Sequence, residues 1–173
     1  NLSLQNSPTF QCYNYFIVVD AMKREFFLRD PKIVARELLG MELVHKSPQG
    51  LISGIITETE AYEAFIDEAS HTFIGKTLRT QSVYMNGGHL YLFRIHMQIC
   101  LNIVTQDAET PSCVLIRSIE PKDGIDRMKI NRGIDNFKNL TTGPGKLTKA
   151  LGIDMTLNGL DICQRSSPII LKK

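Results

Sequence analysis

The stretch LISGIITETEAY, residues 51–62, changes from apolar to acidic along its length. Its β-branched start predicts a strand that is partly buried. A preceding segment, MELVHK at residues 41–46, has a similar apolar character, and the turn-forming sequence KSPQG lies between the two. These residues therefore predict a β-hairpin whose second strand ends in carboxylates.

The acidic end of this strand is the first candidate functional feature. Side chains alternate between the two faces of a strand, so if this strand stays extended the even-numbered positions share one face: Ile56, Glu58, Glu60 and Tyr62. A glutamate that is partly desolvated beside an aromatic ring can serve as a base near neutral pH. The alternative is that these acids only solvate the end of a strand.

Helix signals are clearest in DPKIVARELLG, residues 30–40. Asp30 can cap the helix, Pro31 suits its first turn and Gly40 can end it. Further helices are predicted at residues 123–132 and within 140–153. Strands are predicted at residues 89–95, 99–104 and 112–121, the last ending at Pro121, with one or two β segments in residues 160–173.

The 173 residues have the composition of an ordinary globular protein, with 43% hydrophobic and 22% charged residues and a net charge of +2. Residues 1–86 carry a net charge of −2 and residues 87–173 a net charge of +4, which permits a polyanionic partner. The sequence contains no C-x-x-C pair and no H-E-x-x-H motif, so a zinc site is not expected. Reduced cysteines such as Cys100 and Cys113 indicate a cytosolic protein.

The N-terminal segment differs from the rest of the chain. YFIVVDAM, residues 15–22, is apolar but too short to span a bilayer, and it lacks the flanks of a signal peptide. Met22 is a natural start for the domain. Our hypothesis is that residues 1–21 are an N-terminal extension that is not native, and that residues 22–173 form the domain.

Residues of other strands extend the candidate site beyond the hairpin. Tyr91 and Phe93 share one face of their strand, and Arg117 shares a face with Cys113 and Leu115. If these strand ends meet the acidic one, a glutamate, two or three aromatic rings and an arginine enclose a pocket. Such walls suit a flat, cationic or electron-poor ring. The alternative for the two aromatic residues is ordinary core packing.

Five segments of the chain occur in the order and spacing of a known family: VARELLG, TETEAYEAFIDEASH, YLFRIHMQICLNIV, CVLIRSIEP and LTTGPGKLTKALGI. With these motifs the chain resembles the 3-methyladenine DNA glycosylases of the alkyladenine DNA glycosylase family, over most of its length from Met22 to Leu160. The combination of ETEAY with DEASH, CLNI and VLIR is the specific part. Members of that family flip an alkylated purine out of duplex DNA and cut its N-glycosidic bond with an activated water.

The resemblance implies a role for each of several residues. Glu60 would activate the water as the general base, and Arg117 would hold the water and the flanking phosphate. The base pocket would be formed by three walls and a floor: Tyr62, His71, Phe93 and Asn102. Contacts with DNA would come from Arg79, Lys76 and Lys146 at the backbone, and from Ile95 or His96 as the wedge at a hairpin tip.

The chain departs from the family pattern at two places. The hairpin tip RIHMQ, residues 94–98, is shorter than in the family and lacks its aromatic residue. The family also continues with further strands beyond the region of Leu171, so residues 22–173 are expected to be a glycosylase domain truncated at its C-terminus. The alternative that follows is a catalytically impaired, nucleic-acid-binding relative of the same fold.

We therefore predict a single domain of the α/β (α+β) class, with a curved, mainly antiparallel sheet flanked by helices. The predicted activity is that of a monofunctional DNA glycosylase acting on double-stranded DNA that contains alkylated purines, without a cofactor or metal. A monomer with no membrane association is expected, cytoplasmic in a bacterium or nuclear in a eukaryote. A weaker alternative is an unrelated enzyme that binds a metal at the acidic strand end.

Overall fold

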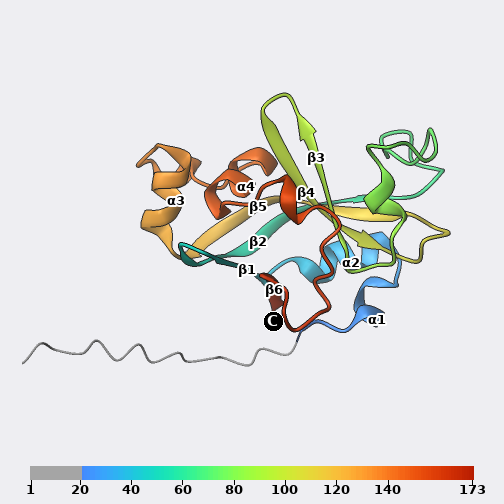
Figure 1. Cartoon of the computed structure of the whole chain (residues 1–173), viewed down its shortest axis with the longest axis horizontal. Helices are drawn as coiled ribbons and strands as arrows, with labels where there is room; N and C mark the ends of the chain where they lie inside the picture. The colour runs from blue at the N-terminus through green and yellow to red at the C-terminus, as the bar shows by residue number, and fades with distance from the viewer. Residues whose placement is uncertain (1–20) are drawn as a thin grey trace, which may run out of the picture.

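Residues 21–173 are described by a computed structural model, so the predicted extension at residues 1–21 lies, apart from Ala21, outside the described residues. Within that part of the chain, six strands form one antiparallel sheet in the order β3-β4-β5-β2-β1-β6. The strands are β1 (Glu42–Ser47), β2 (Gly50–Tyr62), β3 (Leu90–Ile95), β4 (Gln98–Thr105), β5 (Ser112–Asp123) and β6 (Ile169–Lys172). The sheet curls strongly, as Figure 1 shows, and the predicted fold class is confirmed.

Four α-helices accompany the sheet in residues 21–173: α1 (Arg24–Phe27), α2 (Pro31–Leu38), α3 (Ile125–Arg132) and α4 (Pro144–Leu151). Short 3-10 helices are η1 (Gln81–Tyr84), η2 (Phe137–Asn139) and η3 (Met155–Leu157). The predicted helix after Asp30 is confirmed, because the Asp30 side chain accepts a hydrogen bond from the Lys32 amide at 2.8 Å and caps α2. None of these helices is long and apolar enough to cross a membrane.

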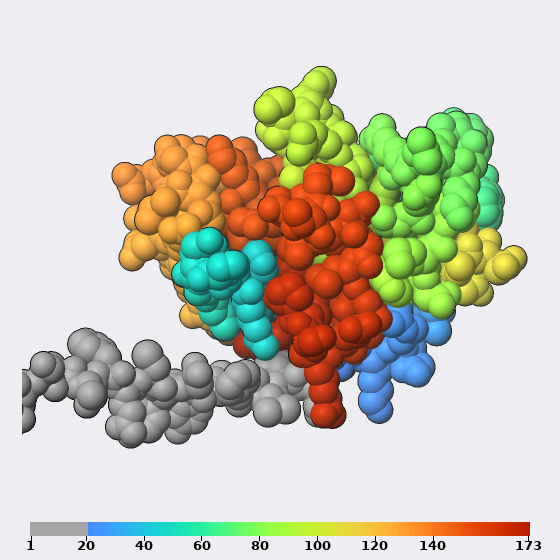
Figure 2. Space-filling model, viewed as in Figure 1, coloured from blue at the N-terminus to red at the C-terminus, as the bar shows by residue number. Residues whose placement is uncertain are grey.

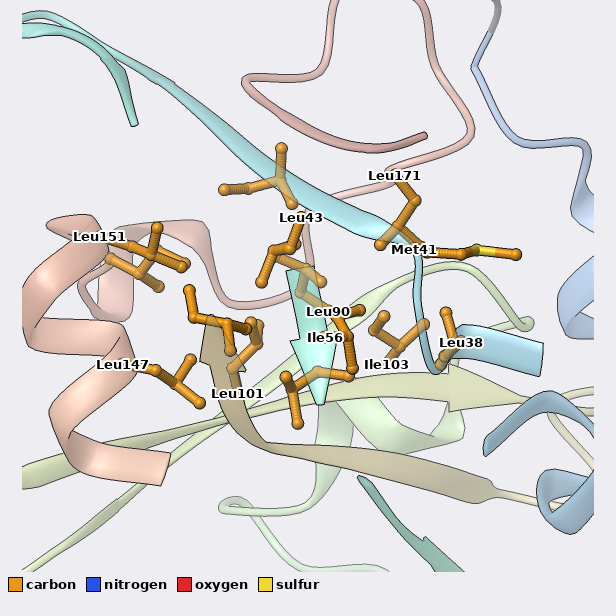
Figure 3. Close-up of a cluster of buried hydrophobic side chains, with 14 of the residues drawn as sticks. Leu38, Met41, Leu43, Ile56, Leu90, Leu101, Ile103, Leu147, Leu151 and Leu171 are labelled. Atoms are coloured by element: carbon orange, nitrogen blue, oxygen red, sulfur yellow. The ribbon is translucent and has the colours of Figure 1, made fainter. Parts of the chain in front are cut away.

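The main hydrophobic core lies between one face of the sheet and helices α2 and α4. Figure 3 shows leucine and isoleucine side chains from both halves of the chain meeting there, for example Leu38 of α2, Leu101 of β4 and Leu147 of α4. A smaller cluster occupies the other face of the sheet: Val83, Tyr91, Phe93, Cys100, Val104, Cys113 and Leu115. Strand alternation explains the division in β3, where Leu90 and Leu92 belong to the main core and the two aromatic residues do not.

The register in which β2 pairs with β5 shifts in the middle of both strands, and the faces to which their side chains point change there. Ile56 faces the main core, but farther along β2 the odd-numbered Ala61 packs against that core and Tyr62 packs against the opposite cluster. The prediction that Ile56 shares a face with Glu60 and Tyr62 is therefore wrong. The cause is a pair of register shifts. Between the pairs Ile56–Ile119 and Glu58–Ser118, β2 contains one additional residue. Between Glu58–Ser118 and Thr59–Ile116, β5 contains one.

The end of β5 also differs from the prediction. The strand continues past Pro121 to Asp123, two residues beyond the predicted end. Pro121 lies opposite Gly54, at a third register shift, and the Ser53 hydroxyl donates a hydrogen bond to the Asp123 carboxylate at 3.0 Å. A proline at an irregular position in a ladder interrupts fewer hydrogen bonds than one in a regular strand, so the pairing can extend.

The predicted hairpins and later helices are confirmed. β1 and β2 pair from Glu42 with Ile55 to Ser47 with Gly50, and β3 pairs with β4 from Leu90 with Ile103 to Ile95 with Gln98. In residues 160–173, where one or two β segments were predicted, there is one strand, β6, and it pairs with β1.

Candidate active site

A pocket of about 220 Å³ lies on the sheet face away from the main core. It is bounded by the end of β2, by β3, β4 and β5, and by the loop that follows β2. The predicted residues that line it are Tyr62, His71, Phe93, Ile95, Asn102 and Arg117. The strand ends therefore meet as the sequence indicated, and the aromatic side chains enclose a cavity as well as packing together.

A carboxylate held by two neighbours lies beside this pocket. One oxygen of Glu60, Oε2, accepts a hydrogen bond from the Tyr62 hydroxyl at 2.6 Å, and Oε1 pairs with Nη1 of Arg117 at 2.9 Å. Arg117 also contacts Glu58, with Nε 3.2 Å from Oε1. The Glu60 side chain is 39% exposed, so this carboxylate is within reach of solvent.

The protonation of the two neighbours follows from their surroundings. Burial works against the charge of Arg117, but the adjacent Glu60 and Glu58 raise its pKa, so it remains a cation. Burial, and then the hydrogen bond to Glu60, raise the pKa of Tyr62. Its hydroxyl therefore keeps its proton at neutral pH and donates a hydrogen bond to the carboxylate.

His71 is held in one orientation by two contacts. Its Nδ1 lies 2.8 Å from the Tyr91 hydroxyl, and Nη2 of Arg79 lies 3.3 Å from its Nε2. Because a guanidinium can only donate, Nε2 must accept, which leaves the ring proton on Nδ1. Burial, and then the charge of Arg79, lower the pKa of His71, so the neutral ring is favoured.

Three rings form one wall of the pocket. His71 meets Phe93 edge-to-face, with ring centroids 4.5 Å apart, and Tyr91 lies 5.5 Å from Phe93. The guanidinium carbon of Arg79 lies 5.3 Å from the centre of the Phe93 ring. A cation therefore already lies against this wall, in the position expected from the attraction of positive charge to an aromatic face.

Asn102 is fixed inside the pocket. It is only 1% exposed, and its Nδ2 donates to the Tyr91 carbonyl at 3.1 Å. Its Oδ1 lies 3.8 Å from the Cys113 sulfur, which donates to it. Burial raises the pKa of the Cys113 thiol to about 12, so the thiol keeps the proton that this contact requires. Both ends of the amide are thus oriented.

The model of the methylpurine-DNA glycosylase family matches residues 25–173. The chain belongs to this family. A protein of Desulfitobacterium hafniense named "Putative 3-methyladenine DNA glycosylase" is 44% identical over 150 residues, which cover 81% of this chain and 74% of that protein. A protein with the same name from Enterococcus faecalis is 44% identical over 81% of this chain and 62% of its own length. Another from Clostridium novyi is 41% identical over 88% of this chain and 80% of its own length.

In this methylpurine-DNA glycosylase family member, the remaining predicted residues lie at different distances from the pocket lining. Arg79 lies against the pocket wall itself. The Lys76 ammonium lies 5.2 Å above the Tyr84 ring. Ile95 lines the pocket, whereas His96, at the hairpin tip, adopts a left-handed conformation with φ of 51° and is not among the residues that line it. Lys146 lies in the first turn of α4.

Some residues of the site were missed by the sequence analysis. The Tyr91 hydroxyl orients His71, although the sequence suggested only a ring in a wall. Pro144, at the start of α4, closes one side of the pocket. Its glycine-flanked position indicated a helix start but gave no sign of which strands the helix would meet.

Proposed function

We propose that the chain is a DNA glycosylase that flips alkylated purines of the 3-methyladenine type out of duplex DNA and hydrolyses their N-glycosidic bond. The family membership and the names of the relatives support the class of enzyme. The observation that carries the mechanism is the Glu60 carboxylate, held by Tyr62 and Arg117 beside a pocket with aromatic walls.

The chemistry needs one base and little else. A purine alkylated at N3 carries positive charge, so the electron pair of the breaking bond neutralises the departing base. The sugar passes through an oxocarbenium-like state, water attacks C1′, and Glu60 takes the proton of the water. Arg117 fixes the carboxylate, and the negative charge of Glu60 stabilises the cationic sugar. No group is then needed to protonate the leaving base.

The pocket supports selection of a cationic base. The aromatic faces of Tyr62 and Phe93 attract a flat ring with positive charge, and a neutral His71 adds no repulsion. Asn102 would form the floor, where its oriented amide can test the edge of the base. A damaged base also costs less to extrude from the duplex than a normal one, which adds to the selectivity.

Contacts with the DNA are assigned to cationic residues around the pocket and to the hairpin tip. Arg79, Lys76 and Lys146 would contact phosphates, as would Arg117 at the flanking position. Ile95 or His96 would fill the gap that the flipped nucleotide leaves. The side chains that line the pocket include no lysine amine, which supports a monofunctional enzyme that releases the base without cutting the strand.

The deciding experiment is Glu60→Gln in a single-turnover assay on a duplex with one 3-methyladenine. We expect base release to fall by roughly 10²- to 10⁴-fold, because a general base is lost, while DNA binding persists. Glu58→Gln is the matched control, since Glu58 is the neighbouring carboxylate that also contacts Arg117. It should stay close to the wild-type rate.

Two outcomes would contradict the proposal. If Glu60→Gln released the base at the wild-type rate, Glu60 would not be the base. If the wild-type protein bound the duplex and released no base, the chain would be a non-catalytic nucleic-acid-binding relative of the family.

A further inference from the structure

A second hollow lies beside the base pocket, on the other side of the β3–β4 hairpin. It has a volume of about 330 Å³ and is lined by Met97, Gln98, Ile99, Arg132, Gly145, Thr148, Lys149 and Ile153. We call this the α4 groove. Its walls therefore come from the hairpin, from α4 with the residue after it, and from the end of α3.

The α4 groove and the base pocket share their dividing wall. Ile95 lines the base pocket while Met97, two residues along the tip, lines the groove. At the start of α4, Pro144 lines the pocket and the next residue, Gly145, lines the groove. Figures 1 and 2 show the hairpin tip projecting from the surface, with α3 and α4 on one side and the segment after β2 on the other.

Positive charge is concentrated in the segment that contributes Arg132 and Lys149 to the α4 groove. Residues 125–151 contain six Lys or Arg and two Asp or Glu. The Arg132 guanidinium is held by the carbonyls of Leu140, at 3.1 Å from Nε, and Asn139, at 3.4 Å from Nη2. Lys149 is exposed, and none of the ion pairs found in residues 21–173 involves it.

The rest of the lining is apolar. Met97 is 91% exposed at the tip, and Ile99 and Ile153 also line the groove. This combination fits one kind of polymer well. A phosphodiester backbone offers anionic phosphates for Lys149 and Arg132, and between them deoxyribose rings whose apolar faces can pack on methionine and isoleucine.

We propose that the α4 groove binds the sugar–phosphate backbone of duplex DNA on the side of the hairpin away from the flipped nucleotide. A hairpin that enters a duplex beside an extruded base must have DNA on both of its sides. The base pocket accounts for one side, and the α4 groove offers matching charge for the other. The inference rests on the proposed function only for the choice of DNA as the partner.

The groove is also built to hold its shape. The Thr148 hydroxyl donates to the Ile99 carbonyl at 2.8 Å, and Gly145 leaves room for Gln98, because a Cβ at Gly145 would lie 2.6 Å from the Cβ of Gln98. The cations on α4 therefore keep a fixed spacing from the hairpin tip. A fixed spacing suits a partner with a regular repeat of charge.

The test is the affinity of the full chain for an undamaged duplex, measured over a series of KCl concentrations. Lys149→Gln should weaken binding by roughly two- to fivefold at 0.1 M salt, as expected for loss of one exposed ion pair. The slope of log K against log salt should become shallower by about 0.9. Lys149→Glu should weaken binding further, and Lys149→Arg should bind like the wild type.

Lys23→Gln is the matched control. It removes the same charge from an exposed position beside α1, at the opposite end of the molecule from the hairpin in Figure 1, and should change neither quantity. If Lys149→Gln and Lys149→Glu kept the wild-type affinity and slope, the α4 groove would not contact DNA. This readout requires no base release. A wild-type protein that binds DNA but does not excise the base would therefore overturn the proposed function, while the proposal that the α4 groove binds DNA would still hold.

Discussion

Each oxygen of the Glu60 carboxylate has a different donor. Arg117 is a charged donor on a neighbouring strand, and Tyr62 is a neutral donor two residues along the same strand. This arrangement leaves the carboxylate little freedom to turn, which is the property that a base aimed at one water requires. It also gives Tyr62 two separable contributions, one from its ring and one from its hydroxyl.

Tyr62→Phe separates these contributions. The ring remains to stack on the base, while the hydrogen bond to the carboxylate is lost. We expect the single-turnover rate of excision to fall by roughly tenfold, the effect of one hydrogen bond to a charged group. The affinity for a duplex that carries the lesion should change much less. Tyr84→Phe is the control, since Tyr84 lies under Lys76 and should leave the rate unchanged.

His71 predicts a dependence of stability on pH. Its pKa in the folded protein is lowered from the ordinary value of 6.5, so between the two values the unfolded chain binds the additional proton. Its contribution to the free energy of unfolding is therefore fully present above pH 6.5 and is lost as the pH falls from there toward the folded-state value.

The measurement is the melting temperature at pH 7.5 and pH 5.5. The wild type should lose more stability over this interval than His71→Gln, which has no proton to take up. An equal loss in the two proteins would show that His71 titrates alike in the folded and unfolded states.

At the scale of elements, the position of the hairpin depends on α4. Thr148 bonds to the hairpin strand, and Gly145 allows the helix to approach Gln98 closely. The helix therefore sets the direction in which the hairpin tip points. The same contact separates the base pocket from the α4 groove.

Gly145→Ala tests this contact. The added methyl group would overlap Gln98, so we expect the free energy of unfolding to fall by roughly 1–3 kcal/mol, as for other overpacked sites. Urea denaturation would measure the change. Adding Gln98→Gly should restore part of the loss, because it removes the atoms that clash. Independent, additive effects of the two substitutions would contradict the contact.

At the scale of the whole molecule, β6 joins the end of the described chain to its beginning. Ile169, Ile170 and Leu171 are buried, and β6 pairs with β1 at the edge of the sheet. Leu171 lies in the main core with Leu38 of α2 and Leu43 of β1. Residues far apart in the sequence thus share one core, and we expect the described chain to unfold as one cooperative unit.

Leu171→Ala should destabilise the whole domain. The side chain is 2% exposed, and its truncation should cost about 2–5 kcal/mol through lost burial and a residual cavity. Urea unfolding followed by two spectroscopic probes should still show a single transition. Ile130→Ala is the control, because Ile130 is exposed and its loss should change stability by about 0.5 kcal/mol or less. Separate transitions for the two ends of the chain would contradict a single unit.

The sequence predicted those parts of the fold whose signals are local. Asp30 and Pro31 marked the start of α2, and the alternation around Tyr91 and Phe93 assigned both rings to one face. Long-range features left no such signal. The cation–aromatic contact of Arg79 with Phe93 joins a loop to a strand, and the pairing of β1 with β6 depends on the order of the whole sheet.

The candidate site shows the same division. The glutamate, the rings and the arginine could be named from motifs and alternation, but the hydrogen bond from Tyr62 to Glu60 and the α4 groove required the positions of the strands and helices. A periodic sequence pattern also does not show where a strand contains an additional residue. Alternation therefore placed Ile56 on the same face as Glu60 and Tyr62, which is wrong, although Glu60 and Tyr62 do lie together.

The paired shift in β2 and β5 has a consequence for how this site can change. The two additional residues compensate each other, so both strands leave the irregularity in register. A deletion in β2 alone would rotate Glu60 and Tyr62 toward the helices, and an uncompensated carboxylate in that core would cost several kcal/mol, comparable to the stability of a domain. The proposed base therefore cannot be moved to another position on β2 by a single insertion or deletion. The position of Glu60 depends on the length of both β2 and β5. A change in the length of either strand alone is therefore expected to destabilise the fold before it produces a new site.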